Sequence, residues 1–141
     1  MAEAAGRAFV FGDNIDTDVL APGHLMKLTP DELARHCLEA VDPAFAGSVR
    51  PGDVVVAGRN FGLGSSREQA AISLKQLGVK ALIAQSFARI FYRNAMNIGL
   101  IAITLPEARD IRAGDSIAVD AEHGTIENLT QQRIYRCAPV P

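Results

Sequence analysis

The residues best suited to chemistry lie together in a glycine-rich stretch near the middle of the chain. Within residues 58–71 (GRNFGLGSSREQAA), two adjacent serines, Ser65 and Ser66, are followed directly by Arg67. A serine hydroxyl can take part in proton transfer, and the planar guanidinium of an arginine can bind a carboxylate or phosphate through two parallel hydrogen bonds. The stretch therefore has the groups needed to bind a small anion and act on it.

The flanking sequence predicts the elements that position these groups. The apolar run 53–57 (DVVVA) is typical of a buried strand. Ser65 and Glu68 match the capping box that begins a helix, and Gly78 stands where a left-handed residue would end it. We therefore expect a strand, a glycine-rich turn and a helix over residues 65–77.

A helix that begins at this turn would provide an anion site. Its first N–H groups have no partner within the helix, and its dipole favours negative charge there. Gly62 and Gly64 allow the backbone to approach a ligand closely. The alternative is a capped helix whose Arg67 is simply solvated, but two serines, an arginine and the preceding glycines at one strand end favour a ligand site.

Three blocks of the sequence resemble those of one protein family. Residues 60–70 (NFGLGSSREQA), 12–18 (GDNIDTD) and 84–94 (AQSFARIFYRN) are similar in order and spacing to the small subunits of the aconitase superfamily. These include the small subunits of isopropylmalate isomerase, homoaconitase and 2,3-dimethylmalate dehydratase. The resemblance extends from about Phe9 to Ile103.

The resemblance implies a hydro-lyase that moves a hydroxyl group by dehydration and rehydration, built on a swivelling β/β/α domain. It assigns the base that removes the carbon-bound proton to Ser65, and it places Asp18 in the active site near a histidine of a large partner subunit. It also implies that Ser66 and Arg67, with the backbone at Gly64, hold a substrate carboxylate. The helix N-terminus and Arg67 are the groups that could stabilise a serine alkoxide.

In this family the departing hydroxyl is taken up by a [4Fe–4S] cluster, which needs three cysteine ligands from the protein. This chain has two cysteines, Cys37 and Cys137, far apart in sequence. We therefore expect it to bind no metal. The cluster would belong to the large iron–sulfur subunit, without which the chain would be inactive.

The resemblance also implies that a loop within about residues 19–50 contacts the variable part of the substrate. Relatives that take an extra carboxylate have an arginine there, whereas this chain has His24, Leu25, Met26 and Lys27. We therefore expect an apolar substituent: isopropylmalate first and a dimethylmalate-like acid second. A homoaconitase-type substrate stays open, because Lys27 could supply the charge.

The remaining pattern predicts one α/β domain over residues 1–141. A central βαβαβ unit with parallel strands is followed by a C-terminal hairpin and one further strand. Ser86 could cap the second helix, and Thr29 and Glu32 form a capping box for a short helix that runs through Cys37. The expected strands are 7–11, 53–57, 79–84, 100–105, 115–119, 124–128 and 133–137, and the second helix covers 87–98.

Composition narrows the partners. At a net charge of −2 with 48% hydrophobic residues, the chain gives no reason to expect nucleic acid or an anionic membrane surface as a partner. No segment approaches the roughly 18 apolar residues of a membrane span, and residues 1–7 lack a signal-peptide core. We therefore expect a cytoplasmic protein.

Several charged and polar residues are expected to lie outside the mechanism. Asp13 and Asp16 are typical of a tight turn, and His36 and His123 of the surface. The roles of two arginines of the second helix, at positions 89 and 93, stay open, because charges on a helix face are usually solvated.

Two other classes of function compete with the enzyme. One is a stand-alone phosphate-binding module, but the glycine-rich turn lacks the lysine of the G-x-x-x-x-G-K-[ST] loop and the dinucleotide G-x-G-x-x-G pattern. The other is a scaffold subunit with a degenerate site, against which the intact Ser65, Ser66 and Arg67 argue.

Overall fold

The structure of the chain is a computed structural model that describes residues 5–20, 29–39, 41–64 and 68–137. Its centre is a seven-stranded sheet in the order β4-β3-β2-β1-β5-β6-β7. The strands are β1 (Gly6–Val10), β2 (Val54–Ala57), β3 (Ala81–Ala84), β4 (Ile101–Thr104), β5 (Ser116–Asp120), β6 (Thr125–Asn128) and β7 (Arg133–Arg136). The helices are α1 (Thr17–Leu20), α2 (Pro30–Ala34), α3 (Phe45–Ser48), α4 (Glu68–Gln76), α5 (Arg89–Asn97) and the 3-10 helix η2 (Pro106–Asp110).

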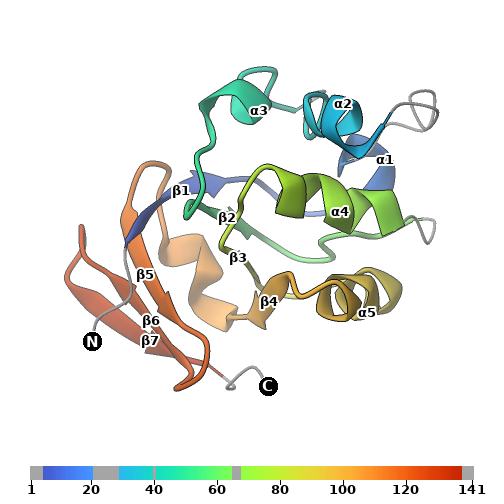
Figure 1. Ribbon diagram of the computed structural model, residues 1–141. Coiled ribbons are helices and arrows are strands. Elements are labelled where there is room, and N and C mark those ends of the chain that lie inside the picture. The colour runs from blue at the N-terminus through green and yellow to red at the C-terminus, as the bar shows by residue number, and fades with distance from the viewer. Residues whose placement is uncertain (1–4, 21–28, 40, 65–67, 138–141) are drawn as a thin grey trace.

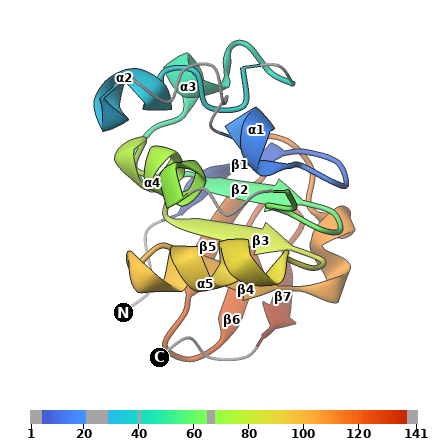
Figure 2. The ribbon, with the colours of Figure 1, turned by 90° about the vertical axis from the view of Figure 1, so that its right-hand side faces the viewer.

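The first four strands run parallel, and the last three are antiparallel. All residues of β2 and β3 are buried, because helices cover one face of the parallel strands while η2 and the antiparallel strands cover the other (Figures 1 and 2). Alternate side chains therefore enter two cores. Val55 and Leu82 pack with α4 and α5, whereas Val56 and Ile83 pack towards β5–β7.

This arrangement confirms the α/β fold, the parallel βαβαβ unit and the C-terminal hairpin that the sequence predicts, and also its further strand β7. The predicted helix end at Gly78 is confirmed as well, since that residue has φ +83°. The predicted capping by Ser65 falls outside the described residues.

The predicted start of the second helix is wrong by two residues. Helix α5 begins at Arg89, its N-cap is Ala88, and the Ser86 hydroxyl does not cap it. Instead the Ser86 Oγ accepts a hydrogen bond of 2.9 Å from the Asn60 N–H, and Phe87 forms an isolated β-bridge with Phe61. Pairing with the turn after β2 thus holds residues 86–87 extended.

The described part of the connection between β1 and β2 contains three short helices, of which the sequence predicts only α2. As predicted, Thr29 caps it by accepting a hydrogen bond from the Glu32 N–H. The helix ends at Ala34 rather than continuing through Cys37. Helices α1 and α3 have four residues each, too few to show a helical period.

No helix among residues 5–20, 29–39, 41–64 and 68–137 is both long and apolar enough to cross a membrane.

Gly62 connects the glycine-rich turn to the core beneath α5. It has φ +86°, and a Cβ placed on it would lie 2.2 Å from a ring carbon of Phe91. Phe91 is fully buried and packs edge-on against Phe61, with 5.3 Å between ring centroids. Only glycine meets both the backbone and the steric requirement at this position.

We expect Gly62→Ala to lower the free energy of unfolding by about 2–4 kcal/mol, because it adds left-handed strain to an overpacked aromatic contact. Gly47→Ala is the matched control. Gly47 lies in α3 with no atom within 4 Å of its Cβ position, so the change should stay within about 1 kcal/mol of zero. Urea denaturation of both variants measures the difference, and equal stabilities would contradict this account.

Candidate functional site

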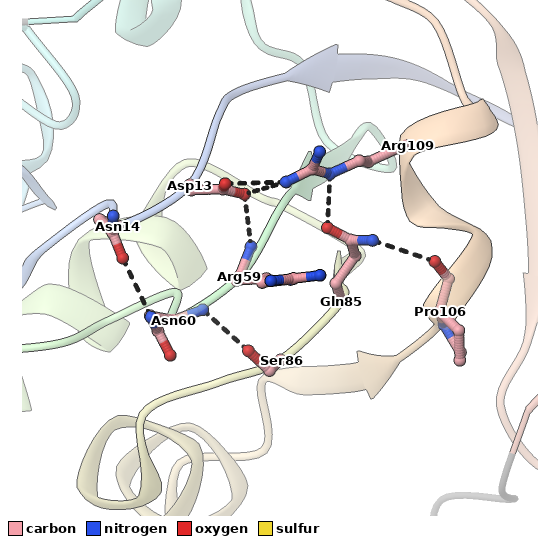
Figure 3. Close-up of polar contacts among 8 residues, drawn as sticks. All are labelled: Asp13, Asn14, Arg59, Asn60, Gln85, Ser86, Pro106 and Arg109. Carbon is pink, nitrogen blue, oxygen red and sulfur yellow. Dashed lines mark hydrogen bonds and ion pairs between the residues drawn. The ribbon is translucent and has the colours of Figure 1, made fainter.

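The turns that follow β1, β2 and β3 meet at the carboxyl ends of the parallel strands (Figure 3). Residues 58–64 lie between the other two and are bonded to both. On one side the Gly62 N–H donates to the Ile15 carbonyl at 2.6 Å, and the Thr17 N–H donates to the Leu63 carbonyl at 2.9 Å. On the other side the Phe61 N–H donates to the Ser86 carbonyl at 3.1 Å. This edge is where ligands bind in open α/β sheets.

The turn after β1 and the turn after β2 lead to two of the predicted site residues. Gly64, with φ +112°, stands so close to Thr17 that a Cβ on it would lie 3.1 Å from the Thr17 Oγ1. Gly64 directly precedes Ser65, and Thr17 directly precedes Asp18. The backbone segments that lead to these two residues are therefore neighbours.

The other predicted site residues fall outside what the structure describes. Ser65, Ser66 and Arg67 lie between the described ranges, as do His24, Leu25, Met26 and Lys27. Asp18 lies in α1, but its side chain is not described. The roles assigned to these residues stay predictions.

One polar network at this edge was not predicted from the sequence (Figure 3). The Asp13 Oδ1 accepts a hydrogen bond from the Arg59 N–H at 2.8 Å, and the Arg109 Nη2 lies 2.9 and 2.8 Å from the two carboxylate oxygens. The Arg109 Nε donates to the Gln85 Oε1 at 2.6 Å, and the Gln85 Nε2 donates to the Pro106 carbonyl at 3.2 Å.

The network favours the ionised form of the Asp13 carboxyl group. The hydrogen bond from the Arg59 backbone N–H, followed by that from the Arg109 guanidinium, holds the pKa of Asp13 below its ordinary value of 3.8. Asp13 is thus an ionised acceptor in the turn after β1, but its carboxylate bonds to distant residues rather than to neighbours within that turn. Residues 13 and 109 are 96 positions apart, so no local pattern could have paired them.

A hollow of about 430 Å3 opens beside this network, on the sheet face away from α4 and α5. Val10, Val56 and Ala108 form apolar parts of its lining, and Asp13 and Arg109 provide charged groups. Val10 is 38% exposed there, because β5 pairs with only the first residues of β1.

The two arginines of α5 face solvent. Arg89 and Arg93 are exposed, alongside Ile90 and Tyr92 on the same helix. The first turn of α5 has no acidic residue to balance these arginines. The exposed surface of its N-terminal half is therefore basic and partly apolar.

The described residues do not fit an iron–sulfur cluster or another metal. Among them no group of three His, Cys, Asp or Glu side chains could hold a metal ion. Cys37 lies fully within the core, where burial raises the pKa of its thiol, and Cys137 is half-buried; both are free. Two such cysteines cannot supply the three thiolates that a cluster needs.

Two histidines that we expected to lie outside the mechanism form surface pairs with nearby carboxylates. His36 pairs with Glu39, and His123 pairs with Asp120 at 2.8 Å. The adjacent carboxylate of Asp120 raises the pKa of His123.

Comparison with known proteins identifies close relatives of this chain. Residues 16–108 match the family of aconitase C-terminal domains. The chain is 53% identical over 138 residues to the 3-isopropylmalate dehydratase small subunit of Moorella thermoacetica, an alignment that covers 96% of this chain and 83% of that protein. It is 54% identical over 135 residues to the methanogen homoaconitase small subunit of Methanothermobacter thermautotrophicus, which covers 95% and 78%.

A solved structure points to the same group of relatives. The crystal structure of 3-isopropylmalate dehydratase from Methanocaldococcus jannaschii superimposes with a TM-score of 0.92 at 47% identity, covering 98% of this chain and 83% of that one. The 3-isopropylmalate dehydratase and homoaconitase small subunits match this chain almost equally well, at 53% and 54% identity. Overall identity therefore does not decide between these two names.

The state of Asp13 leads to a testable pKa. Removing the guanidinium in Arg109→Gln should raise the pKa of Asp13 only part of the way to its ordinary value, because the Arg59 N–H remains. A carboxyl group whose pKa is lower in the folded than in the unfolded chain stabilises the fold at pH values above its unfolded-state pKa. That stabilisation is lost as the pH falls through the lowered pKa of the folded chain. NMR titration of the Asp13 carboxyl carbon measures both values, and an unchanged pKa in the variant would contradict this view.

Proposed function

This chain belongs to the family of aconitase C-terminal domains, and from that membership we infer that it is the small subunit of a hydro-lyase of the 3-isopropylmalate dehydratase type. The observation that carries the inference is about 50% identity to such small subunits over nearly the whole chain. The reaction removes water from a hydroxy acid and adds it back with the hydroxyl on the neighbouring carbon, which links the enzyme to leucine biosynthesis.

The difficult step is removal of a proton from a carbon next to a carboxylate. We assign the base to Ser65, whose alkoxide would accept that proton. The groups available to stabilise the alkoxide are the first N–H groups of α4, which begins at Glu68, and the guanidinium of Arg67. The contact between Gly64 and Thr17 supports the assignment, because it brings the backbone before Ser65 next to the backbone before Asp18.

A second task is to hold the substrate while the proton moves. Ser66 and Arg67 would bind a substrate carboxylate, with Arg67 donating two parallel hydrogen bonds. The left-handed backbone at Gly64 packs against Thr17, where a Cβ would lie 3.1 Å from the Thr17 Oγ1, so glycine suits the close turn that leads to Ser66 and Arg67.

The iron–sulfur cluster of the family has no place in the described part of this chain. A deeply buried thiol and one half-buried thiol do not form a ligand set, and we assign the cluster to a large partner subunit, as the family implies. The substrate would then lie between the two chains. The small subunit would contribute the base, the carboxylate site and a specificity loop.

For the substrate we propose an acid with an apolar γ-substituent, isopropylmalate before a dimethylmalate-like acid. A third carboxylate in a closed pocket needs a fixed cation, or it loses its hydration without compensation. Met26 cannot supply that charge, whereas a thioether packs readily against a branched alkyl group. The second candidate is a homoaconitase-type acid, which the 54% identity to a homoaconitase small subunit favours and which Lys27 could serve.

The assignment of the base is tested in the complex with the large subunit. Ser65→Ala should lower kcat by about 10²-fold or more, as expected for the loss of a positioned proton acceptor. Arg67→Lys should mainly raise KM, because it weakens substrate binding by about 1–3 kcal/mol of lost charge-assisted hydrogen bonding. Ser116→Ala, at the start of β5 on the antiparallel strands, is the matched control and should change neither constant. Near-normal kcat in Ser65→Ala would mean that another residue is the base.

The assignment of the substrate is tested by competition between acids. The wild-type pair should turn over isopropylmaleate faster than homoaconitate at equal concentration, and Met26→Arg should shift the preference towards homoaconitate by adding a cation. Leu129→Arg, which adds the same charge at an exposed position after β6, controls for charge alone. If the wild-type pair preferred homoaconitate, the homoaconitase candidate would replace this one.

A further inference from the structure

The network around Asp13 connects the carboxyl ends of all four parallel strands (Figure 3). Asp13 follows β1, Arg59 follows β2 and Gln85 follows β3, while Pro106 begins η2 just after β4. Asp13 and Arg109 both lie outside residues 16–108, the part of the chain that matches the aconitase C-terminal domain family. Arg59 and Gln85, which also bond within the network, lie inside that part.

The ion pair stands at the beginning of a short backbone ladder. From Asp13 onwards the turn after β1 runs beside the turn after β2. The Asn14 N–H donates to the Arg59 carbonyl at 2.8 Å, and later bonds join Gly62 to Ile15 and Thr17 to Leu63. Beyond the last bond the two segments reach Ser65 and Asp18. A shift at the first rung would therefore carry through to the two residues proposed for catalysis.

The fit at the first rung is tight. A Cβ on Gly58 would lie 1.8 Å from the Asp13 Oδ1, so the carboxylate occupies the space that any other residue would fill. The same oxygen accepts the hydrogen bond from the Arg59 N–H. Asp13 thereby fixes the backbone at the point where β2 enters the glycine-rich turn.

A second arginine–aspartate pair lies at the opposite ends of β1 and β2. There Asp53 accepts from the N–H groups of Arg7 and Arg50, both at 2.9 Å, and pairs with the Arg7 guanidinium at 3.3 Å. The side chain of Asp53 is only 7% exposed, whereas those of Asp13 and Arg109 are 39% and 58% exposed. Exposed ion pairs contribute little to stability, so stability alone does not account for the pair between Asp13 and Arg109.

We propose that Asp13 and Arg109 are positioning residues, whose ion pair holds the turn at residues 59–64 against residues 13–17 and thereby fixes the backbone that leads to Ser65 relative to the backbone that leads to Asp18. Neither residue touches the reacting atoms in this account. The proposal rests on the proposed function, because it concerns the geometry of that base.

Kinetics of the complex test the proposal at saturating large subunit. Arg109→Gln should lower kcat by about tenfold or more with KM changed less than about threefold, since small displacements of catalytic groups are costly to rate. Arg109→Lys, which keeps the charge, should recover part of kcat. Arg7→Gln breaks the pair at the other end of the strands and should leave kcat within about twofold. Asp13→Asn, which keeps an oxygen for the Arg59 N–H, should reproduce the loss if Arg109→Gln fails to fold.

Amide hydrogen exchange of the chain alone provides a readout that needs no activity. In Arg109→Gln the N–H groups of Arg59, Gly62 and Thr17 should exchange faster than in the wild type, while those of Val55 and Leu82 stay unchanged. Unchanged exchange with kcat within about twofold would overturn the proposal, and so would an equal loss of kcat in Arg7→Gln. A wild-type pair that is inactive on every acid tested would instead contradict the proposed function.

Discussion

The structure depends on the position of β2 between β1 and β3. Parallel pairing on both sides aligns the carboxyl ends of three strands, so that the turns that follow them meet at one edge of the sheet. The glycine-rich turn after β2 is bonded to both neighbouring turns before α4 begins. Gly64 and Thr17 lie side by side at that meeting point, and they directly precede the proposed base Ser65 and the proposed active-site residue Asp18.

The helices over one face and the antiparallel strands over the other hold the parallel strands in this alignment. They bury β2 and β3 completely, which keeps the parallel strands together, and Phe91 of α5 closes the space beneath Gly62. Cys37 lies in the core and Cys137 follows β7, and among the described residues no group of three His, Cys, Asp or Glu side chains could hold a metal ion. In the proposed function the chemistry is divided between two chains: the small subunit would hold the base and the carboxylate site, and the large subunit the cluster.

The sequence predicts the framework well because its strands are short runs of β-branched residues between glycines, and because Gly78 and Thr29 end or begin helices by local bonding. It does not predict α1 or α3, which are too short to show a period. It also fails at Ser86 and Arg109, whose partners Asn60 and Asp13 are 26 and 96 positions away. Contacts over such distances depend on the strand order, which appears only once the sheet is assembled.

The most direct test of the account is to purify this chain and the large subunit separately and to assay each alone and both together, with iron measured in every sample. The account predicts no iron and no dehydratase activity in this chain, and activity on isopropylmalate only when the two are mixed. A cluster absorption band or dehydratase activity in this chain alone would contradict it.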